Sequence, residues 1–411
     1  MDVNIAFILT SLIIGIGFFS NYFFKKTKIP DIIWLVAFGF IIGPALNLIN
    51  ASALVNYFPL FSAIALLTIL FEGGSSINIY KLIRESGGVF LLTTIGFILS
   101  ASVVGLITYF VFRLNPITSL LLGSIVGGTS SAIVVPTLEN LEELKRIKRE
   151  PSIMLKMESV LTDPIVIIVS LVLIQTLILS PGINTGYVIL TKIVSLLSIS
   201  IVVGFAAGVL WGGVWHKFFK YKYHYMLTIG FVFLIYVLSE LVGGSGAIAS
   251  FMVGLVLGNV GSVRKMLKIK HVLAGLNRET RMFNSYITFF VRTFFFTLMG
   301  VMISMSRIEL IVYGILISLI LLGLRYGAVV ISTIGKGLTR NDKITMTLIY
   351  PRGLAAAVLA SMPFVQYKIP GTDIFSDVVF TVILTTVIIS TIGLAIFERE
   401  SNKAIKNNPK P

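Results

Sequence analysis

The chain has 411 residues, of which 56% are hydrophobic and only 12% are charged, and its formal net charge is +15. A soluble domain contains about 45–50% apolar and about 25% charged residues, so this composition excludes an ordinary soluble protein. It indicates an all-α polytopic membrane protein, because many apolar runs are long enough to cross a bilayer. The chain has no cysteine, which excludes disulfides, thiol catalysis and cysteine-bound metals.

Apolar runs separated by helix breakers predict about thirteen transmembrane helices. The first run begins without a basic segment or a small-residue cleavage site, so we expect a retained helix and not a signal peptide. In chain order, the predicted helices cover approximately residues 4–24, 31–47, 55–74, 88–112, 117–138, 152–179, 186–211, 225–242, 245–260, 282–305, 308–334, 344–364 and 374–397.

Lysine and arginine are concentrated in alternate loops of this scheme. If the loop after the first helix is cytoplasmic, the alternate loops and the C-terminal tail contain 25 of the 33 basic residues. The opposite loops contain only Arg113, Arg307 and Lys368. Because cytoplasmic loops are enriched in Lys and Arg, the pattern predicts an extracellular N-terminus and a cytoplasmic C-terminus in the cell membrane. The same rule accounts for the positive net charge, so we expect membrane lipid and no nucleic acid as a partner.

The stretch Met157–Ser170 is apolar, yet it contains the acids Glu158 and Asp163. Carboxylates at membrane depth cost roughly 2.5–3.5 kcal/mol each on insertion scales, so they are rare there and mark functional sites. Positions five apart on a helix lie roughly 140° apart, so the two acids can have different partners. Asp163 has no basic residue one turn away in its own helix, which favours a cation and proton site over a structural ion pair.

Glu158 is expected to be mainly structural. An arginine at membrane depth needs a carboxylate or carbonyl partner, and we expect Arg325 to pair with Glu158, with Arg352 as the alternative. Glu72 ends the third predicted helix. It is either an interfacial charge or a gate on the cytoplasmic side of the ion pathway.

Two of the predicted helices contain sequences that should interrupt them. The fifth reads GSIVGGTSSAIVVP over Gly123–Pro136, and the twelfth contains YPRGLAAAV over Tyr350–Val358. If the seventh helix is a linker, these two occupy equivalent positions in two six-helix halves of inverted topology. Paired interrupted helices of this kind mark the binding site of many transporters. The alternative is that the small residues only allow close helix packing.

Five motifs follow one another along nearly the whole chain. They are FEGG at Phe71–Gly74, GGTSSAIVVP at Gly127–Pro136, MESVLTDP at Met157–Pro164, GLRYGAVV at Gly323–Val330 and YPRGLAAAV at Tyr350–Val358. With this set the chain resembles the monovalent cation/proton antiporter superfamily, and most closely the NhaP-like sodium/proton antiporters. The five motifs in this order are specific for the family, although each motif alone is only weak evidence of membership.

The resemblance implies an ion site at the centre of the chain. Asp163 would bind the cation or the proton, and Ser159 and Thr129 would help to coordinate Na⁺. Thr162 and Ser130 are further candidates for ligand oxygens. In this family the residue before the aspartate is usually asparagine, whereas this chain has Thr162. That departure makes a K⁺/H⁺ antiporter on the same fold the nearest alternative.

The family fold also implies a core domain that moves against an interface domain, and the interface domain is expected to form a homodimer. The interface domain would comprise residues 1–80 and 223–306, and the core domain residues 81–182 and 307–398. Residues 183–222 would contain the linker helix, and residues 399–411 would form a cytoplasmic tail.

The expected function is exchange of Na⁺ or Li⁺ for H⁺ by alternating access. Thr162 cannot ionise, so only Asp163 changes protonation in the site and the exchange should be electroneutral. A sodium-coupled symporter on the same fold is a further alternative. An ion channel would need a filter motif, and an intramembrane hydrolase would need paired aspartates or a GxSxG elbow; none of these is visible. We therefore expect a transporter, not an enzyme, with no cofactor besides the transported ions.

Overall fold

The computed structural model describes residues 3–27, 30–48, 58–143, 147–179, 186–218, 221, 223–268, 274–302 and 307–407. Every regular element within these ranges is helical. The elements are α1 (Val3–Thr27), α2 (Asp31–Phe40), η1 (Ile41–Ala45), α4 (Phe58–Ser76), α5 (Ile79–Phe112), α6 (Pro116–Ile125), α7 (Ser131–Glu143), α8 (Arg149–Leu179), α9 (Gly186–Trp215), η2 (His216–Phe218), α10 (His224–Leu241), α11 (Gly246–Gly258), α12 (Val260–Met266), α13 (Arg278–Met302), α14 (Ile308–Ser332), α15 (Arg340–Leu348), α16 (Leu354–Val365) and α17 (Phe375–Asn407).

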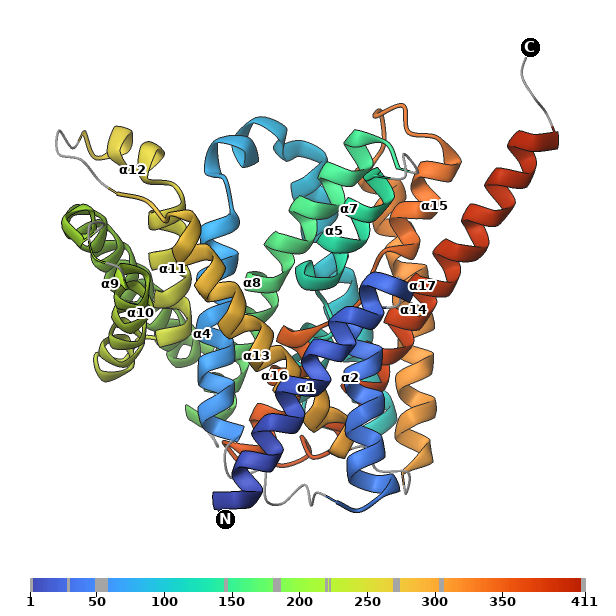
Figure 1. Ribbon diagram of the computed structural model, residues 1–411, viewed down its shortest axis with the longest axis horizontal. Helices are drawn as coiled ribbons and strands as arrows, with labels where there is room; N and C mark the ends of the chain where they lie inside the picture. Colours follow the sequence, from blue (N-terminus) through green and yellow to red (C-terminus); the bar gives the residue numbers. More distant parts are fainter. Residues whose placement is uncertain are drawn as a thin grey trace.

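Each of the predicted membrane segments falls on one of these helices or on a consecutive pair, which confirms the all-α class. Within the described ranges, seven helices are long and apolar enough to cross a bilayer, and the bent pair α11–α12 makes eight if it is one span. The other segments coincide with shorter apolar helices, such as α6 and α16. The number of crossings therefore remains a prediction. The start of α1 and the end of α17 lie at opposite ends of the bundle (Figure 1).

Both predicted helix breaks are present. Residues 126–130 separate α6 from α7, and residues 349–353 separate α15 from α16. The backbone N–H of Ser130 donates a hydrogen bond to the carbonyl oxygen of Pro351, at 2.9 Å. The two interruptions are therefore in direct contact, and the broken helices meet in the middle of the protein.

The first half of each broken helix begins at a clear N-terminal signal. At α6, the Asn115 side chain accepts a hydrogen bond from the Ile117 N–H at 2.9 Å, and Pro116 occupies the first helical position. At α15, Thr339 and Asp342 form a capping box in which each side chain bonds the other residue's backbone N–H. These caps fix where the two half-helices start, and hence where they reach the breaks.

The last helix is longer than the sequence analysis predicted. Residues 399–411 were expected to form a tail, but α17 continues as far as Asn407. The sequence between Phe397 and Asn407 contains neither glycine nor proline, and the first breaker is Pro409. Nothing in this stretch therefore stops the helix at the membrane surface.

The loop predicted after the ninth helix also contains a helix, α12, which is bent by 88° from α11. Asn259 lies at the bend. Its amide nitrogen donates to the carbonyls of Ile77 and Leu255, at 2.7 and 2.9 Å, and its amide oxygen accepts from the Ile79 N–H at 2.9 Å. These bonds satisfy backbone groups that the bend exposes and tie it to the α4–α5 junction.

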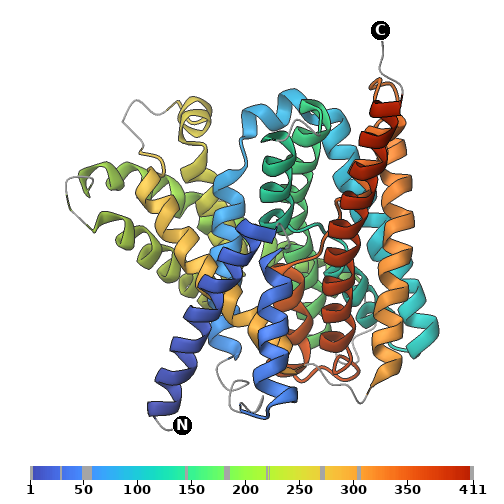
Figure 2. The same ribbon diagram turned by 45° about the vertical axis from the view of Figure 1, so that its right-hand side comes forward.

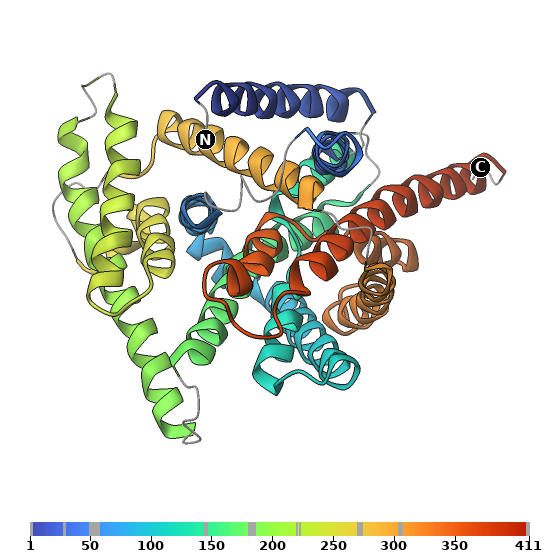
Figure 3. The same cartoon turned by 90° about the horizontal axis from the view of Figure 1, so that it is seen from below.

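The helices form two groups in space (Figures 2 and 3). In one group α11 packs against α4, α9 and α10, and α13 packs against α1, α2 and α4. In the other group α5 packs against α6, α8 and α14, and α17 packs against α14 and α16. Contacts of α4 with α8 and α16 join the groups. The assignment of these helices to an interface and a core domain remains a prediction, and α9, which was expected to be a linker, packs against α11 in the first group.

The contact between α4 and α11 depends on glycine. A Cβ atom at Gly74 would lie 2.2 Å from the Phe251 carbonyl oxygen, and one at Gly254 would lie 2.2 Å from the Phe71 carbonyl oxygen. No side chain fits between backbones that close, so glycine sets the helix separation at both positions. This packing fixes the C-terminal half of α4, which carries Glu72.

Candidate functional site

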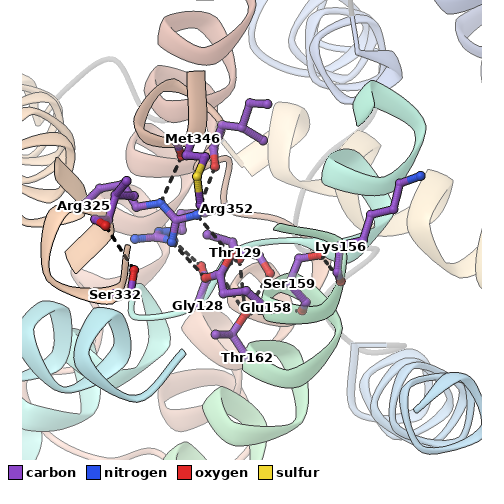
Figure 4. A network of polar contacts seen from close by, with 12 residues as sticks. Gly128, Thr129, Lys156, Glu158, Ser159, Thr162, Arg325, Ser332, Met346 and Arg352 are labelled. Atoms are coloured by element: carbon purple, nitrogen blue, oxygen red, sulfur yellow. Dashed lines mark hydrogen bonds and ion pairs between the residues drawn. The ribbon is translucent and has the colours of Figure 1, made fainter. Parts of the chain in front are cut away.

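Glu158 is fully engaged by a neighbouring arginine (Figure 4). Arg325 Nη1 and Nη2 donate to Glu158 Oε1 and Oε2, at 2.9 and 3.1 Å, and the Thr129 hydroxyl donates to Oε1 at 3.0 Å. The exposed fractions of Glu158 and Arg325 are only 2% and 5%. Two parallel N–H···O bonds of this kind form one of the strongest pairings available to a carboxylate. The predicted pairing with Arg325 is therefore present, whereas Arg352 lies against the Gly128 carbonyl instead.

The two arginines also satisfy carbonyl groups at the helix breaks. Arg325 Nε donates to the Met346 carbonyl at 3.4 Å, close to the end of α15. Arg352 Nη1 donates to the Gly128 carbonyl at 2.5 Å, just beyond the end of α6. Carbonyls at the C-terminal end of a helix lack helical partners and carry partial negative charge. Each arginine thus donates a hydrogen bond to a backbone carbonyl near a helix break, which would otherwise have no partner in the apolar surroundings.

The hydroxyl groups predicted to bind Na⁺ line the break between α6 and α7. The hydroxyls of Thr129 and Thr162 lie 3.2 Å apart, and the Thr129 N–H donates to the Thr162 hydroxyl, also at 3.2 Å. The Ser159 hydroxyl donates to a carbonyl of its own helix at 3.0 Å. Among the described residues, neither these hydroxyls nor that of Ser130 forms a hydrogen bond with Asp163. Their part in binding Na⁺ remains a prediction.

Asp163 has different surroundings from Glu158. Its Oδ2 accepts hydrogen bonds from the backbone N–H and the hydroxyl of Ser131, at 3.1 and 2.5 Å. Both residues are half-buried. No lysine or arginine in the described part of the chain forms an ion pair with Asp163. A carboxylate held only by neutral donors can bind a cation or a proton, because no fixed positive charge neutralises it.

Ser131 was not among the predicted site residues, although the adjacent Thr129 and Ser130 were. Ser131 is the first residue of α7, and the first turn of a helix has backbone N–H groups without helical partners. The position of Ser131 at the start of α7 was therefore the sequence feature that could have identified it as a donor to a carboxylate.

Glu72, on α4, is held by α13 of the same helix group. Its Oε2 accepts hydrogen bonds from the Thr288 hydroxyl at 3.0 Å and from the Asn284 amide at 3.3 Å, both on α13. The next residue, Gly73, faces the ring of Pro164, since a Cβ atom there would lie 3.4 Å from Cγ of the ring. Glu72 is thus close to the Asp163 region of α8, and its role as a gate remains a prediction.

Two cavities lie between helices of the two groups. One, of about 240 Å³, lies between the end of α4 and the first half of α8. Its lining includes Ser76, about one turn beyond Glu72, and Val160, about one turn before Asp163. The other, of about 370 Å³, is lined by the α1–α2 turn, α7, α17 and the break at residues 349–353. Both cavities separate helices that a rocking motion would move apart.

Comparison with known proteins gives concordant results. A family model described as the transmembrane part of the sodium/hydrogen exchanger matches residues 8–399. Na(+)/H(+) antiporter 1 of Methanocaldococcus jannaschii is 28% identical over 407 residues, covering 95% of this chain and 89% of that protein. K(+)/H(+) antiporter NhaP2 of Shewanella baltica is 23% identical over 417 residues, covering 100% of this chain and 69% of that protein. The solved structure of the M. jannaschii sodium proton antiporter MjNhaP1 at pH 8 has a TM-score of 0.77 and 24% identity, over 97% of this chain and 98% of that chain.

Proposed function

The chain belongs to the transmembrane sodium/hydrogen exchanger family, and on this premise we propose that it exchanges Na⁺ or Li⁺ for H⁺, with Asp163 as the shared site. The contrast between the two acids of α8 supports this assignment. Glu158 is buried and paired with Arg325, whereas Asp163 is half-buried and has no ion pair among the described residues. An unpaired carboxylate in apolar surroundings gains from binding either a cation or a proton.

Competition for one carboxylate is enough to couple the two fluxes. A cation or a proton neutralises Asp163, but the two do not bind together. The neutral site crosses as the core helices rock against the interface helices, while an empty, charged site stays because a bare carboxylate facing the hydrocarbon barrier is too costly. The two cavities between the helix groups support this alternating access. We further propose that the interface helices form the homodimer contact and that the C-terminus is cytoplasmic.

K⁺/H⁺ exchange is the second candidate. The relatives that match this chain over most of its length include proteins described as Na⁺/H⁺ antiporters and others described as K⁺/H⁺ antiporters. The hydroxyls of Thr129, Ser159 and Thr162 are uncharged oxygen donors that suit either monovalent ion. Thr162 stands where the NhaP-like antiporters, which the sequence resembles, usually have asparagine, and this departure is the reason for the K⁺ candidate.

Transport in vesicles separates these candidates. The purified protein is reconstituted with a pH-sensitive dye inside, a pH gradient is imposed, and NaCl, LiCl or KCl is added outside. We expect Na⁺ and Li⁺ to dissipate the gradient at concentrations where K⁺ does not. Dissipation by K⁺ alone would establish the second candidate. No dissipation by any of the three cations would contradict antiport altogether.

The Asp163→Asn variant tests the shared site. Asparagine keeps the shape of the side chain but can neither ionise nor take up the exchanged proton. We expect cation-dependent proton movement to fall to the level of empty vesicles. The matched control is Asp373→Asn, which makes the same change at a half-exposed acid paired with Arg307 outside the site. Substantial exchange by folded Asp163→Asn protein would refute the central assignment.

A further inference from the structure

One oxygen of Asp163 receives both of its hydrogen bonds. Ser131 donates its backbone N–H and its hydroxyl to Oδ2, at 3.1 and 2.5 Å. In the part of the chain that the structure describes, no group donates to Oδ1. Asp163 and Ser131 are half-buried as residues, whereas Glu158 is only 2% exposed. The two oxygens of Asp163 are therefore not equivalent.

The half-helix α7 holds Ser131 in place without help from Asp163. At its other end Glu142 accepts a hydrogen bond from Lys156 Nζ at 2.7 Å and another from the Ser152 hydroxyl, both on α8. The two helices are thus connected at both ends of α7. A donor mounted on such a rigid element is oriented before the ion arrives, which lowers the entropy cost of binding.

Neighbouring residues do not substitute for this donor. The Thr129 hydroxyl donates to Glu158, and the Ser130 N–H donates to the Pro351 carbonyl. The start of α7 adds a favourable partial positive charge near the carboxylate, but a helix end alone does not fix the rotation of the carboxyl group. Two donors on the same oxygen do fix it, because they define both its direction and its plane.

We propose that Ser131 is the positioning residue of the exchange site: it anchors Asp163 Oδ2 to α7 and so presents Oδ1 to the incoming cation. This inference rests on the proposed function, since it assumes that Asp163 binds the transported ion. Ser131 acts through Asp163, so its loss should weaken cation binding more than it slows the movement of the loaded site.

Three variants test this role in the vesicle assay. Ser131→Ala removes the hydroxyl, Ser131→Thr keeps it, and Ser170→Ala is the control. Ser170 is on the same helix as Asp163, and its buried hydroxyl has no hydrogen-bond partner among the described residues. Exchange is measured against Na⁺ concentration at the most alkaline pH that supports activity, where protons compete least with the cation.

We expect Ser131→Ala to raise the apparent KM for Na⁺ by about tenfold or more, the size expected for losing a hydrogen bond to a charged group. Its maximal rate should stay within about twofold of the unmodified protein. Ser131→Thr should restore the KM, and Ser170→Ala should leave both parameters unchanged. A purely structural role would lower the maximal rate through loss of folded protein and leave the KM unaltered.

Sodium-dependent thermal stabilisation gives an independent readout, because the stabilisation of the folded protein by a bound ion depends on the ratio of the ion concentration to its dissociation constant. Ser131→Ala should need about tenfold more Na⁺ for the same rise in melting temperature. If that variant does not fold, Ser131→Cys replaces it, since a thiol keeps the volume but is a weak donor. A KM within twofold of the unmodified value for the Ala or Cys variant, or a Thr variant as impaired as Ala, would overturn the proposal. Failure of the unmodified protein to exchange cations would instead contradict the proposed function.

Discussion

Glu158 and Asp163 are five residues apart on one helix, yet the groups around them differ in kind. Glu158 receives two donors from an arginine and one from a threonine, and almost none of it is exposed. Asp163 receives two donors from a serine and is partly accessible. A buried carboxylate that is paired with an arginine is already neutralised and has no need of a bound ion. A carboxylate without such a partner is neutralised only when it binds a cation or a proton.

The two acids should therefore differ in their effect on stability. Glu158→Ala leaves Arg325 buried without its carboxylate, which can cost about 3–5 kcal/mol. Asp163→Ala removes a charge that has no ionic partner among the described residues. The melting temperature of this variant should therefore fall far less than that of Glu158→Ala. The measurement is thermal unfolding of both purified variants in the same detergent. A larger loss for Asp163→Ala than for Glu158→Ala would show that the roles are reversed.

The arginine partner could be predicted from the sequence, and the serine partner could not. Few basic residues lie at membrane depth, so Glu158 had two candidate partners, and one of them forms the pair. Thr129, Ser130 and Ser131 are adjacent, and all three carry a hydroxyl. Which one meets Asp163 depends on the backbone direction within the break, which has no periodicity for a sequence to reveal. The structure directs the first to Glu158 and the third to Asp163.

At the scale of helices, the breaks were predictable because glycine, proline and hydroxyl residues cluster where helical hydrogen bonding stops. Residues 126–130 and 349–353 interrupt the fifth and twelfth predicted helices. The bend between α11 and α12 was not predicted. It depends on Asn259 reaching backbone groups of the α4–α5 junction, a contact distant in sequence. Local composition thus shows where a helix stops, while long-range contacts decide which way the chain turns.

The start of α15 offers a test of how a broken helix is held at its N-terminal end. Asp342 Oδ2 accepts from Thr339 N–H at 2.8 Å and from Lys148 Nζ at 2.7 Å, so it caps the helix and ties it to the segment before α8. Partial burial disfavours its charged form, but the hydrogen bonds from Lys148 and Thr339 outweigh this and hold the pKa of Asp342 below its usual value of 3.8.

Asp342→Asn should therefore destabilise the protein by about 1 kcal/mol at neutral pH, a typical value for a cap and an exposed ion pair. A carboxyl group with a lowered pKa contributes its full stabilisation above its usual value and loses it as the pH falls through the folded value. The difference in melting temperature should be constant between about pH 7 and pH 5 and shrink towards pH 3. Lys148→Met removes the ion pair alone and should cost less. A difference that grows on acidification would contradict this assignment.

At the scale of the whole molecule, the two helix groups lie around Asp163, which has no ion pair among the described residues, and α4 and α13 bring a second acid, Glu72, close to it. Glu72 is held by the neutral groups Thr288 and Asn284 between these two helices. Glu72 is on α4, which is expected to belong to the interface domain, whereas Asp163 is on α8, which is expected to belong to the core domain. If the core moves relative to the interface domain, Asp163 crosses with its ion and Glu72 stays behind.

This arrangement predicts electroneutral exchange. An exchanger moves net charge when the protons carried one way outnumber the monovalent cations carried the other way. Thr162 cannot ionise, Glu158 forms an ion pair with Arg325, and Glu72 lies on α4, which the proposed motion leaves behind. One proton should therefore return for each cation. The test uses vesicles clamped with valinomycin and K⁺, with Na⁺ as substrate, and the exchange rate should not depend on the imposed potential.

A rate that changes steeply with potential, or a current that tracks turnover on a supported membrane, would show that a second charge moves. Glu72→Gln then identifies its source. If Glu72 carries the extra proton, the variant becomes insensitive to potential while it still exchanges Na⁺. If the dependence persists in Glu72→Gln, a group outside the pair of Asp163 and Glu72 carries the charge. If the exchange rate is independent of potential in both the unmodified protein and Glu72→Gln, Asp163 is the single group that changes protonation in the transport cycle. We expect this result, because Asp163 forms no ion pair with any described lysine or arginine.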